Sequence, residues 1–172
     1  MRKGTPVFQI VGYKNSGKTS LLSELVAYGT LEGDRISAIK RHGHDEPLKV
    51  MHRETDSYRL HESGAFMTGV DSAGRFQLEL DHKENFPLSQ LIDLYCFFKP
   101  DLIVIEGYKH ELYPKAVIIK REEDLKLLNE LSNIQFVITW NETWTEHLSL
   151  PVYRLSEWRQ CLPKVYPIAK GS

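Results

Sequence analysis

Short apolar runs alternate with amphipathic stretches along most of the chain. A brief run of branched apolar residues bounded by polar ones is typical of a buried parallel strand. We expect such strands at 7–11, 36–39, 101–107, 116–119, 134–138 and 151–155, and a β-hairpin built from 65–70 and 76–80 around the turn 71–74. The run DLIVIE at 101–106 is the most strongly apolar of them, and it ends in a carboxylate.

Apolar residues at helical spacing fall between these strands. They predict a helix from Leu21 to a stop at Gly29, a short helix over Asp56–Glu62, one that begins near Pro87, and one over 125–131. Strands that alternate with helices indicate a three-layer α/β fold with a mostly parallel central sheet, here with an added β-hairpin. No internal repeat or low-complexity linker interrupts the pattern, so we expect a single domain over 1–172.

The stretch GYKNSGKT at 12–19 matches the phosphate-loop pattern, and it lies between a predicted strand and a predicted helix. Its glycines let successive N–H groups turn toward phosphate oxygens, and the helix that follows adds its positive end. Lys18 would bridge the outer phosphates, and Thr19 would give its hydroxyl to Mg²⁺. The pattern predicts a P-loop NTPase-type fold whose nucleotide site contains Gly12, Asn15, Ser16, Gly17, Lys18, Thr19 and Ser20.

Lys14 allows two interpretations. Some dimeric P-loop ATPases carry a signature lysine five residues before the main one, but Lys14 lies four residues before Lys18. We therefore interpret it as a solvated surface lysine.

Glu106 directly follows the apolar run LIVI, where P-loop proteins carry the acidic residue that holds Mg²⁺ through water. An ionised carboxylate at the end of a buried strand is costly unless it meets a cation, which favours a functional role. We expect Lys18 and Glu106 to act as the catalytic groups. For Asp56 two interpretations stay open: a carboxylate near the metal, or a helix cap.

Basic and imidazole side chains gather in KRHGHD at 40–45. His42 and His44 are two residues apart, so an extended backbone would point both to one side. No further ligand is spaced for a metal site. An anion site for a phosphorylated partner molecule and a flexible polar loop are the open alternatives. Lys109, shortly after Glu106 in the chain, would project over the site at Glu106.

The end of the strand at 134–138 is a candidate for contact with the base of the nucleotide. Asn141 or Glu142 could supply the hydrogen-bonding group there, and an ordinary strand-to-loop turn is the alternative. The NKxD sequence that many GTPases use for guanine is absent.

Composition narrows the possible functions. The formal net charge of −1 and a pI near 6.7 argue against a general nucleic-acid binder. No apolar run approaches the roughly 20 residues that cross a bilayer, so no membrane role is expected. Cys96 and Cys161 form no CxxC pair, which indicates reduced thiols and a cytoplasmic protein.

Taken together, four segments resemble the MobB family of molybdopterin-guanine dinucleotide biosynthesis proteins. They are GYKNSGKTSLL, IKRHGHD, ETDSYR with Gly64-Ala65 after it, and DLIVIEGYK followed by Pro114-Lys115 and Lys120-Arg121. The resemblance runs from Val7 to about Arg121. Members of the family often have Gly-Lys before an Asp-Ser pair, whereas this chain has Glu54-Thr55 before the pair that begins at Asp56. This departure from the resemblance leaves the role of Asp56 open.

The resemblance implies a GTP-binding protein with weak Mg²⁺-dependent GTPase activity that acts mainly as an adaptor. It implies a homodimer that works beside MobA, the guanylyltransferase that joins GMP to molybdopterin. His42, His44 and Lys109 would then lie where molybdopterin or its phosphate can reach. Two alternatives stay open: a small-molecule kinase that uses ATP or GTP, and a structural dimer partner whose nucleotide site is a relic.

Overall fold

The computed structural model describes residues 4–42, 55–81 and 86–171 of the 172-residue chain. The chain forms two compact units, residues 1–43 with 92–172 and residues 44–91, and we describe each by itself. The single domain over 1–172 stays a prediction. None of the described helices is both long enough and apolar enough to cross a membrane.

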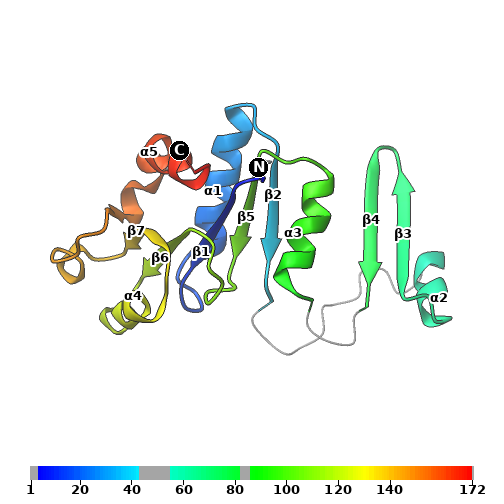
Figure 1. The fold of residues 1–172 in the computed structure, drawn as a ribbon, viewed down its shortest axis with the longest axis horizontal. Coiled ribbons are helices and arrows are strands. Elements are labelled where there is room, and N and C mark those ends of the chain that lie inside the picture. The colour runs from blue at the N-terminus through cyan, green and yellow to red at the C-terminus, as the bar shows by residue number, and fades with distance from the viewer. Residues whose placement is uncertain (1–3, 43–54, 82–85, 172) are drawn as a thin grey trace. The chain divides into compact units, whose positions relative to one another are not determined.

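A six-stranded sheet is the centre of the larger unit (Figure 1). Its strands are β1 (Val7–Val11), β2 (Ile36–Lys40), β5 (Leu102–Glu106), β6 (Lys115–Ile119), β7 (Ile134–Thr139) and β8 (Val152–Arg154). Their order is β2-β5-β1-β6-β7-β8, and every neighbouring pair is parallel. The predicted α/β fold with its mostly parallel central sheet is therefore confirmed.

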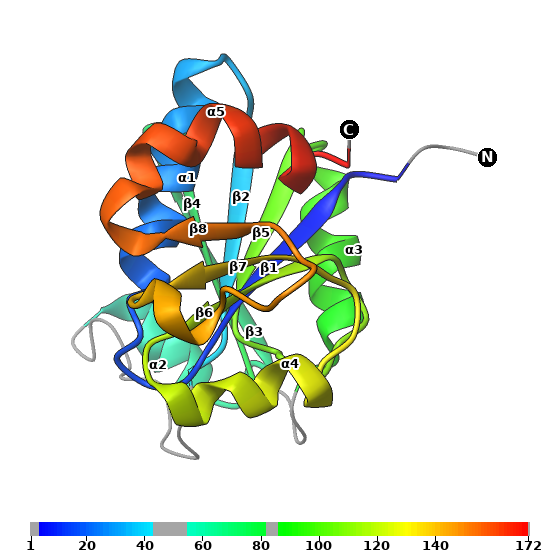
Figure 2. The same cartoon turned by 90° about the vertical axis from the view of Figure 1, so that its left-hand side faces the viewer.

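Helices cover both faces of this sheet. Figure 2 shows α1 (Lys18–Leu31) and α5 (Trp158–Ala169) on one side, and α4 (Lys126–Glu130) on the other. Along β1 the side chains alternate between two cores: Ile10 packs in the cluster under α1 and α5, and Val11 packs in the cluster with Leu127 of α4. Burial on both faces explains why the strands are almost continuously apolar.

The remaining helical elements are short or lie at the edge of the sheet. They are α3 (Leu88–Phe97), which crosses the boundary between the two units, and the 3₁₀ turns Glu122–Leu125, Glu142–Trp144 and Leu155–Glu157. Within the larger unit, the hydroxyl of Tyr95 on α3 donates to the carbonyl oxygen of Ala38 on β2 at 3.3 Å.

The ends of α1 and the presence of α5 differ from the prediction. Gly29 does not stop α1, which continues to Leu31. A Cβ at Gly29 would lie 2.3 Å from Ile36 and 2.4 Å from the hydroxyl oxygen of Tyr166, so the glycine instead lets α1 pack closely against β2 and α5. The sequence pattern does not predict α5, because Pro163 and Pro167 interrupt its helical periodicity.

The smaller unit contains α2 (Asp56–Glu62) and an antiparallel hairpin of β3 (Met67–Ser72) and β4 (Arg75–Leu80). Both turn residues have positive φ, 49° at Ala73 and 77° at Gly74, as the tight two-residue turn of a hairpin requires. The predicted helix and the predicted hairpin are both present.

Candidate nucleotide-binding site

The phosphate loop joins the buried strand β1 to α1, and two glycines permit its shape. A Cβ at Gly12 would lie 2.8 Å from the Ser16 hydroxyl oxygen and 3.2 Å from the Ile118 carbonyl oxygen, so this position has no room for a side chain. Gly17 has a φ of 98° and precedes α1 without any side-chain cap. The first N–H groups of the helix therefore point out of the loop without a capping side chain, which suits an anion.

Ser16 adds a buried hydroxyl to this loop. The residue is 1% exposed, and its Oγ has no hydrogen-bond partner in the described part of the chain. A buried hydroxyl without a partner is costly, and a phosphate oxygen could supply that partner.

Lys18 folds back over the loop. Its ammonium donates to the Tyr13 carbonyl oxygen at 2.7 Å. Partial burial lowers the pKa of Lys18, the nearby Lys40 lowers it further, and Glu106 opposes this shift. The Lys18 ammonium is thus partly shielded from solvent, and it lies beside the position that phosphates would occupy.

Three side chains meet where α1 begins and where β2 and β5 end. The Thr19 hydroxyl donates to a Glu106 carboxylate oxygen at 2.7 Å. Lys40 lies 3.3 Å from the other carboxylate oxygen and donates to the Thr19 hydroxyl at 3.1 Å. Glu106 is 6% exposed, so this cluster gives the buried carboxylate the cation that it needs. Hydroxyl and carboxylate oxygens are also the ligands that Mg²⁺ prefers, so Thr19 and Glu106 fit that ion.

Sequence reasoning placed Lys40 among the basic residues of KRHGHD but did not connect it with Glu106. No local pattern signals this contact, because it depends on the register of two strands that are distant in sequence: β2 and β5 pair from Ile36 opposite Leu102 to Lys40 opposite Glu106.

Lys109 lies on the connection from β5 to β6, residues 107–114. The Gln9 side-chain amide donates to the carbonyl oxygens of Gly107 and Tyr108 at 3.0 and 2.9 Å, which holds this connection over β1. The Lys109 ammonium lies 5.2 Å from the centre of the Tyr13 ring. The structure therefore brings Lys109 beside Tyr13 of the phosphate loop, and its role in binding a ligand stays a prediction.

The other predicted site residues are more scattered. His42 is exposed just beyond β2, Ser20 is exposed on α1, and His44 lies outside the described residues. Asp56 belongs to the smaller unit; it is the first residue of α2, whose N-cap is Thr55, and it pairs with Arg59 at 3.5 Å. The Asn141 side-chain oxygen accepts from the N–H and the hydroxyl of Thr143 at 3.1 and 3.0 Å.

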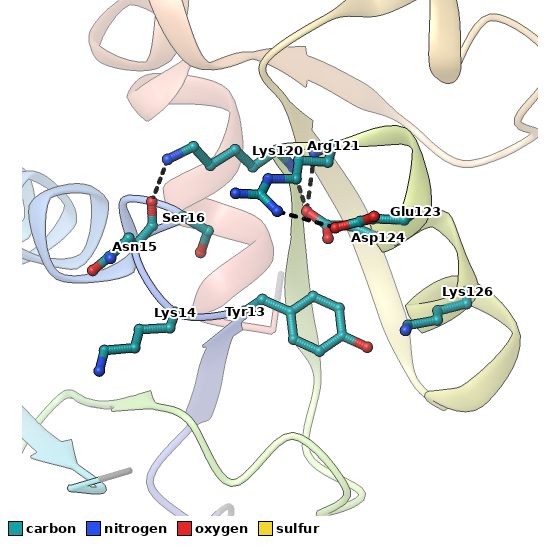
Figure 3. A pocket seen from close by; sticks show the side chains of 9 residues that line it. All are labelled: Tyr13, Lys14, Asn15, Ser16, Lys120, Arg121, Glu123, Asp124 and Lys126. Atoms are coloured by element: carbon teal, nitrogen blue, oxygen red, sulfur yellow. Dashed lines mark hydrogen bonds and ion pairs between the residues drawn. The ribbon is translucent and has the colours of Figure 1, made fainter. Parts of the chain in front are cut away.

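A cavity of about 390 Å³ lies beside the phosphate loop (Figure 3). Its wall combines four basic residues, two acidic residues and one aromatic ring: Lys14, Lys120, Arg121, Lys126, Glu123, Asp124 and Tyr13, with Asn15 and Ser16. The buried Asp124 carboxylate accepts the N–H groups of Lys120 and Arg121 at 2.9 and 3.0 Å, which fixes the end of β6. The Lys126 ammonium lies 5.3 Å from the centre of the Tyr13 ring.

Fold and site together define a P-loop protein of the nucleotide-binding class. The family described as molybdopterin guanine dinucleotide synthesis protein B, MobB, matches residues 7–140. The chain therefore belongs to the MobB family.

Relatives and solved structures agree with this assignment. The chain is 35% identical over 152 residues to a probable molybdopterin-guanine dinucleotide biosynthesis adapter protein of Bacillus subtilis, covering 88% of this chain and 87% of that one. An adapter protein of Haemophilus influenzae is 28% identical over 141 residues, or 82% of this chain and 78% of that one.

Among solved structures, a MobB homolog from Bacillus stearothermophilus matches with a TM-score of 0.77 and 33% identity, over 96% of this chain and 99% of that one. A structure of Bacillus subtilis MobB matches with a TM-score of 0.78 and 31% identity, over 96% of both chains.

Proposed function

We propose that this protein is a GTP-binding adapter, with weak Mg²⁺-dependent GTPase activity, that assists the attachment of GMP to molybdopterin. The observation that carries the proposal is the contact of Thr19 with Glu106 beside the phosphate loop, over which Lys18 folds, in a MobB-family chain. The adapter names of its relatives support the pathway. A MobA-like guanylyltransferase is the proposed partner, and a homodimer is the proposed assembly.

The chemistry of the site follows from its charges. The N–H groups at the start of α1 and the Lys18 ammonium would bind the phosphates. Thr19 and Glu106 would hold Mg²⁺, the carboxylate through water, and the ion would neutralise charge on the phosphoryl group. Glu106 already accepts from Thr19 and pairs with Lys40, so it is a poor base for activating water. Slow hydrolysis is the expected result.

The second ligand is proposed to be molybdopterin, a pterin that carries a phosphate. Lys109 beside Tyr13 supports a site for it close to the nucleotide. The cavity on that side of the loop offers an aromatic face and an excess of basic over acidic residues, four against two. Such a wall suits an anionic ring system.

Calorimetry with GTP, ATP and molybdopterin, each with and without Mg²⁺, tests the proposal. We expect Mg²⁺-dependent binding of GTP to the wild-type protein, and loss of that binding in Lys18→Ala but not in Lys14→Ala, a matched change in the same loop. Undiminished GTP binding by Lys18→Ala would refute this assignment of the loop. Transfer of a labelled γ-phosphate to a small molecule would favour the kinase alternative instead.

A further inference from the structure

Trp140 is a half-exposed aromatic residue that is nevertheless fixed in place. It follows β7 directly and is 49% exposed. Its backbone N–H donates to the Ile119 carbonyl oxygen at 3.0 Å, and its indole N–H donates to the Ser16 carbonyl oxygen at 3.1 Å. The ring is therefore attached to the phosphate loop itself, across 124 residues of sequence.

Lys120 supports the same ring. Its ammonium lies 4.8 Å from the centre of the Trp140 ring and donates to the Asn15 carbonyl oxygen at 2.8 Å. A single cation thus holds the indole and the loop together. A ligand that packs on the indole would pay little additional ordering cost, because the ring already has its orientation.

The order of the strands tells in which direction a bound nucleotide extends. The phosphate loop follows β1, which has β5 on one side and β6 on the other. Thr19, Lys40 and Glu106 gather on the β5 side, so the outer phosphate and its metal belong there. The sugar and base must then extend toward the ends of β6 and β7, where Lys120 and Trp140 lie.

We propose that Trp140, supported by Lys120, is the platform on which the base of the bound nucleotide stacks. This inference rests on the proposed nucleotide-binding function. A purine has a broad aromatic face that matches the exposed indole, and stacking of a base on an aromatic side chain makes a substantial contribution to binding.

The neighbouring polar residues are occupied by local contacts. The Asn141 side-chain oxygen accepts twice from Thr143. The Glu142 carboxylate pairs with Arg154. The ring face of Trp140 is the contact that this strand end offers to the face of a purine, and it supplies affinity rather than recognition of the purine edge; contact of Asn141 with the base stays a prediction.

Two ligands and two variants test the platform by calorimetry. Tripolyphosphate has the phosphates of GTP but no base, so it reports on the loop alone. We expect Trp140→Ala to bind GTP about tenfold more weakly or worse. We also expect it to bind tripolyphosphate within about twofold of the wild-type protein. Trp140→Phe lacks the indole N–H but keeps an aromatic face, so its GTP affinity should stay within about threefold.

The alternative outcomes are distinct. Equal weakening of GTP and tripolyphosphate by Trp140→Ala would show that the residue only positions the loop, and unchanged GTP binding would remove it from the site; either result overturns the platform. Failure of the wild-type protein to bind GTP at all would overturn the proposed function as well. Trp144→Phe, a change in the same segment, serves as the control.

Fluorescence gives a second readout. The chain has three tryptophans, and Trp158 is 2% exposed. GTP should quench the wild-type and Trp144→Phe proteins to a similar degree, whereas Trp140→Phe should lose most of the quenching. Equal quenching in all three proteins would contradict stacking on Trp140.

Discussion

The hydroxyl oxygen of Thr19 lies 2.7 Å from a carboxylate oxygen of Glu106, although 87 residues separate them. The first residue pair of the proposed metal site is thus already in contact, at the start of α1 and the end of β5. Lys40 contacts both groups, so its positive charge balances the negative charge of the Glu106 carboxylate.

Glu106→Gln should separate metal binding from phosphate binding. The amide keeps the shape of the carboxylate but loses its charge, so the hydrated Mg²⁺ should lose its anionic partner while the phosphates lose a repulsive neighbour. We expect Mg²⁺ to strengthen GTP binding by about tenfold less than in the wild-type protein, with metal-free binding equal or tighter. Calorimetry with and without Mg²⁺ measures both effects. A variant with unchanged Mg²⁺ dependence would show that Glu106 does not help to hold the metal; Glu24→Gln, a partly exposed carboxylate on α1 that pairs with Arg159, is the control.

Lys40→Ala should make the site more receptive to Mg²⁺. The lysine is a cation 3.3 Å from Glu106, and its side chain is 55% exposed, so solvent screens much of the interaction. We expect half-maximal nucleotide binding at about two- to fivefold lower Mg²⁺ concentration. Titration of Mg²⁺ at fixed GTP provides the measurement. A higher Mg²⁺ requirement would mean instead that Lys40 helps to hold the phosphates.

Local patterns were enough to predict the loop, β1 and α2 with the observed bounds, because each depends on residues close together in sequence. The other elements depend on contacts between segments that are distant in sequence. The local pattern predicts a helix stop at Gly29, because nothing nearby in sequence reveals that Tyr166 packs against it. The helix α5 was missed because its prolines disfavour a helix locally, while burial of Trp158 and Val165 against the sheet stabilises one.

The site residues divide in the same way, into those that a local pattern predicts and those that come together only through contacts between distant segments. The residue types of the phosphate loop predict its own chemistry, but the partners of that loop come from other strands. The contacts of Lys40 with Glu106 and of Trp140 with Ser16 depend on which strands are neighbours and in what register they pair. A single sequence contains this order only indirectly, since strands that are adjacent in the sheet are often distant in the chain.

Lys18→Met should stabilise the nucleotide-free protein while abolishing GTP binding. Burial lowers the pKa of Lys18 below 10.5, which means that the folded state disfavours its charge. The charged lysine therefore costs stability at neutral pH, and this cost disappears as the pH rises through the folded and then the unfolded pKa. We expect the free energy of unfolding of Lys18→Met to be about 0.5–1 kcal/mol higher at pH 7.

Urea denaturation at pH 7 and at pH 10 measures this gain, which should shrink at the higher pH. Lys164→Met, a change at an exposed lysine of α5, should leave stability unchanged. A destabilised Lys18→Met would mean that the bond to the Tyr13 carbonyl oxygen outweighs the cost of burial.

Asp34→Asn should destabilise the protein in a pH-dependent way. The Asp34 carboxylate accepts from the Lys170 ammonium at 2.7 Å and from the Tyr166 hydroxyl, so it ties the turn after α1 to the end of α5. The Lys170 bond, followed by the Tyr166 bond, holds the pKa of Asp34 below its usual 3.8. A carboxylate with a lowered folded pKa contributes stability above its unfolded pKa and loses it as the pH falls through the folded value.

We therefore expect Asp34→Asn to lower the free energy of unfolding by about 1–2 kcal/mol at pH 7. The difference from the wild-type protein should narrow as the pH falls below about 4, because the unfolded carboxylate then takes up a proton before the folded one does. Urea denaturation between pH 7 and pH 3 follows both effects, and Asp93→Asn, an exposed aspartate on α3, is the control. A difference that stays constant over this range would show that the tie depends on hydrogen-bond geometry alone and not on the charge of Asp34.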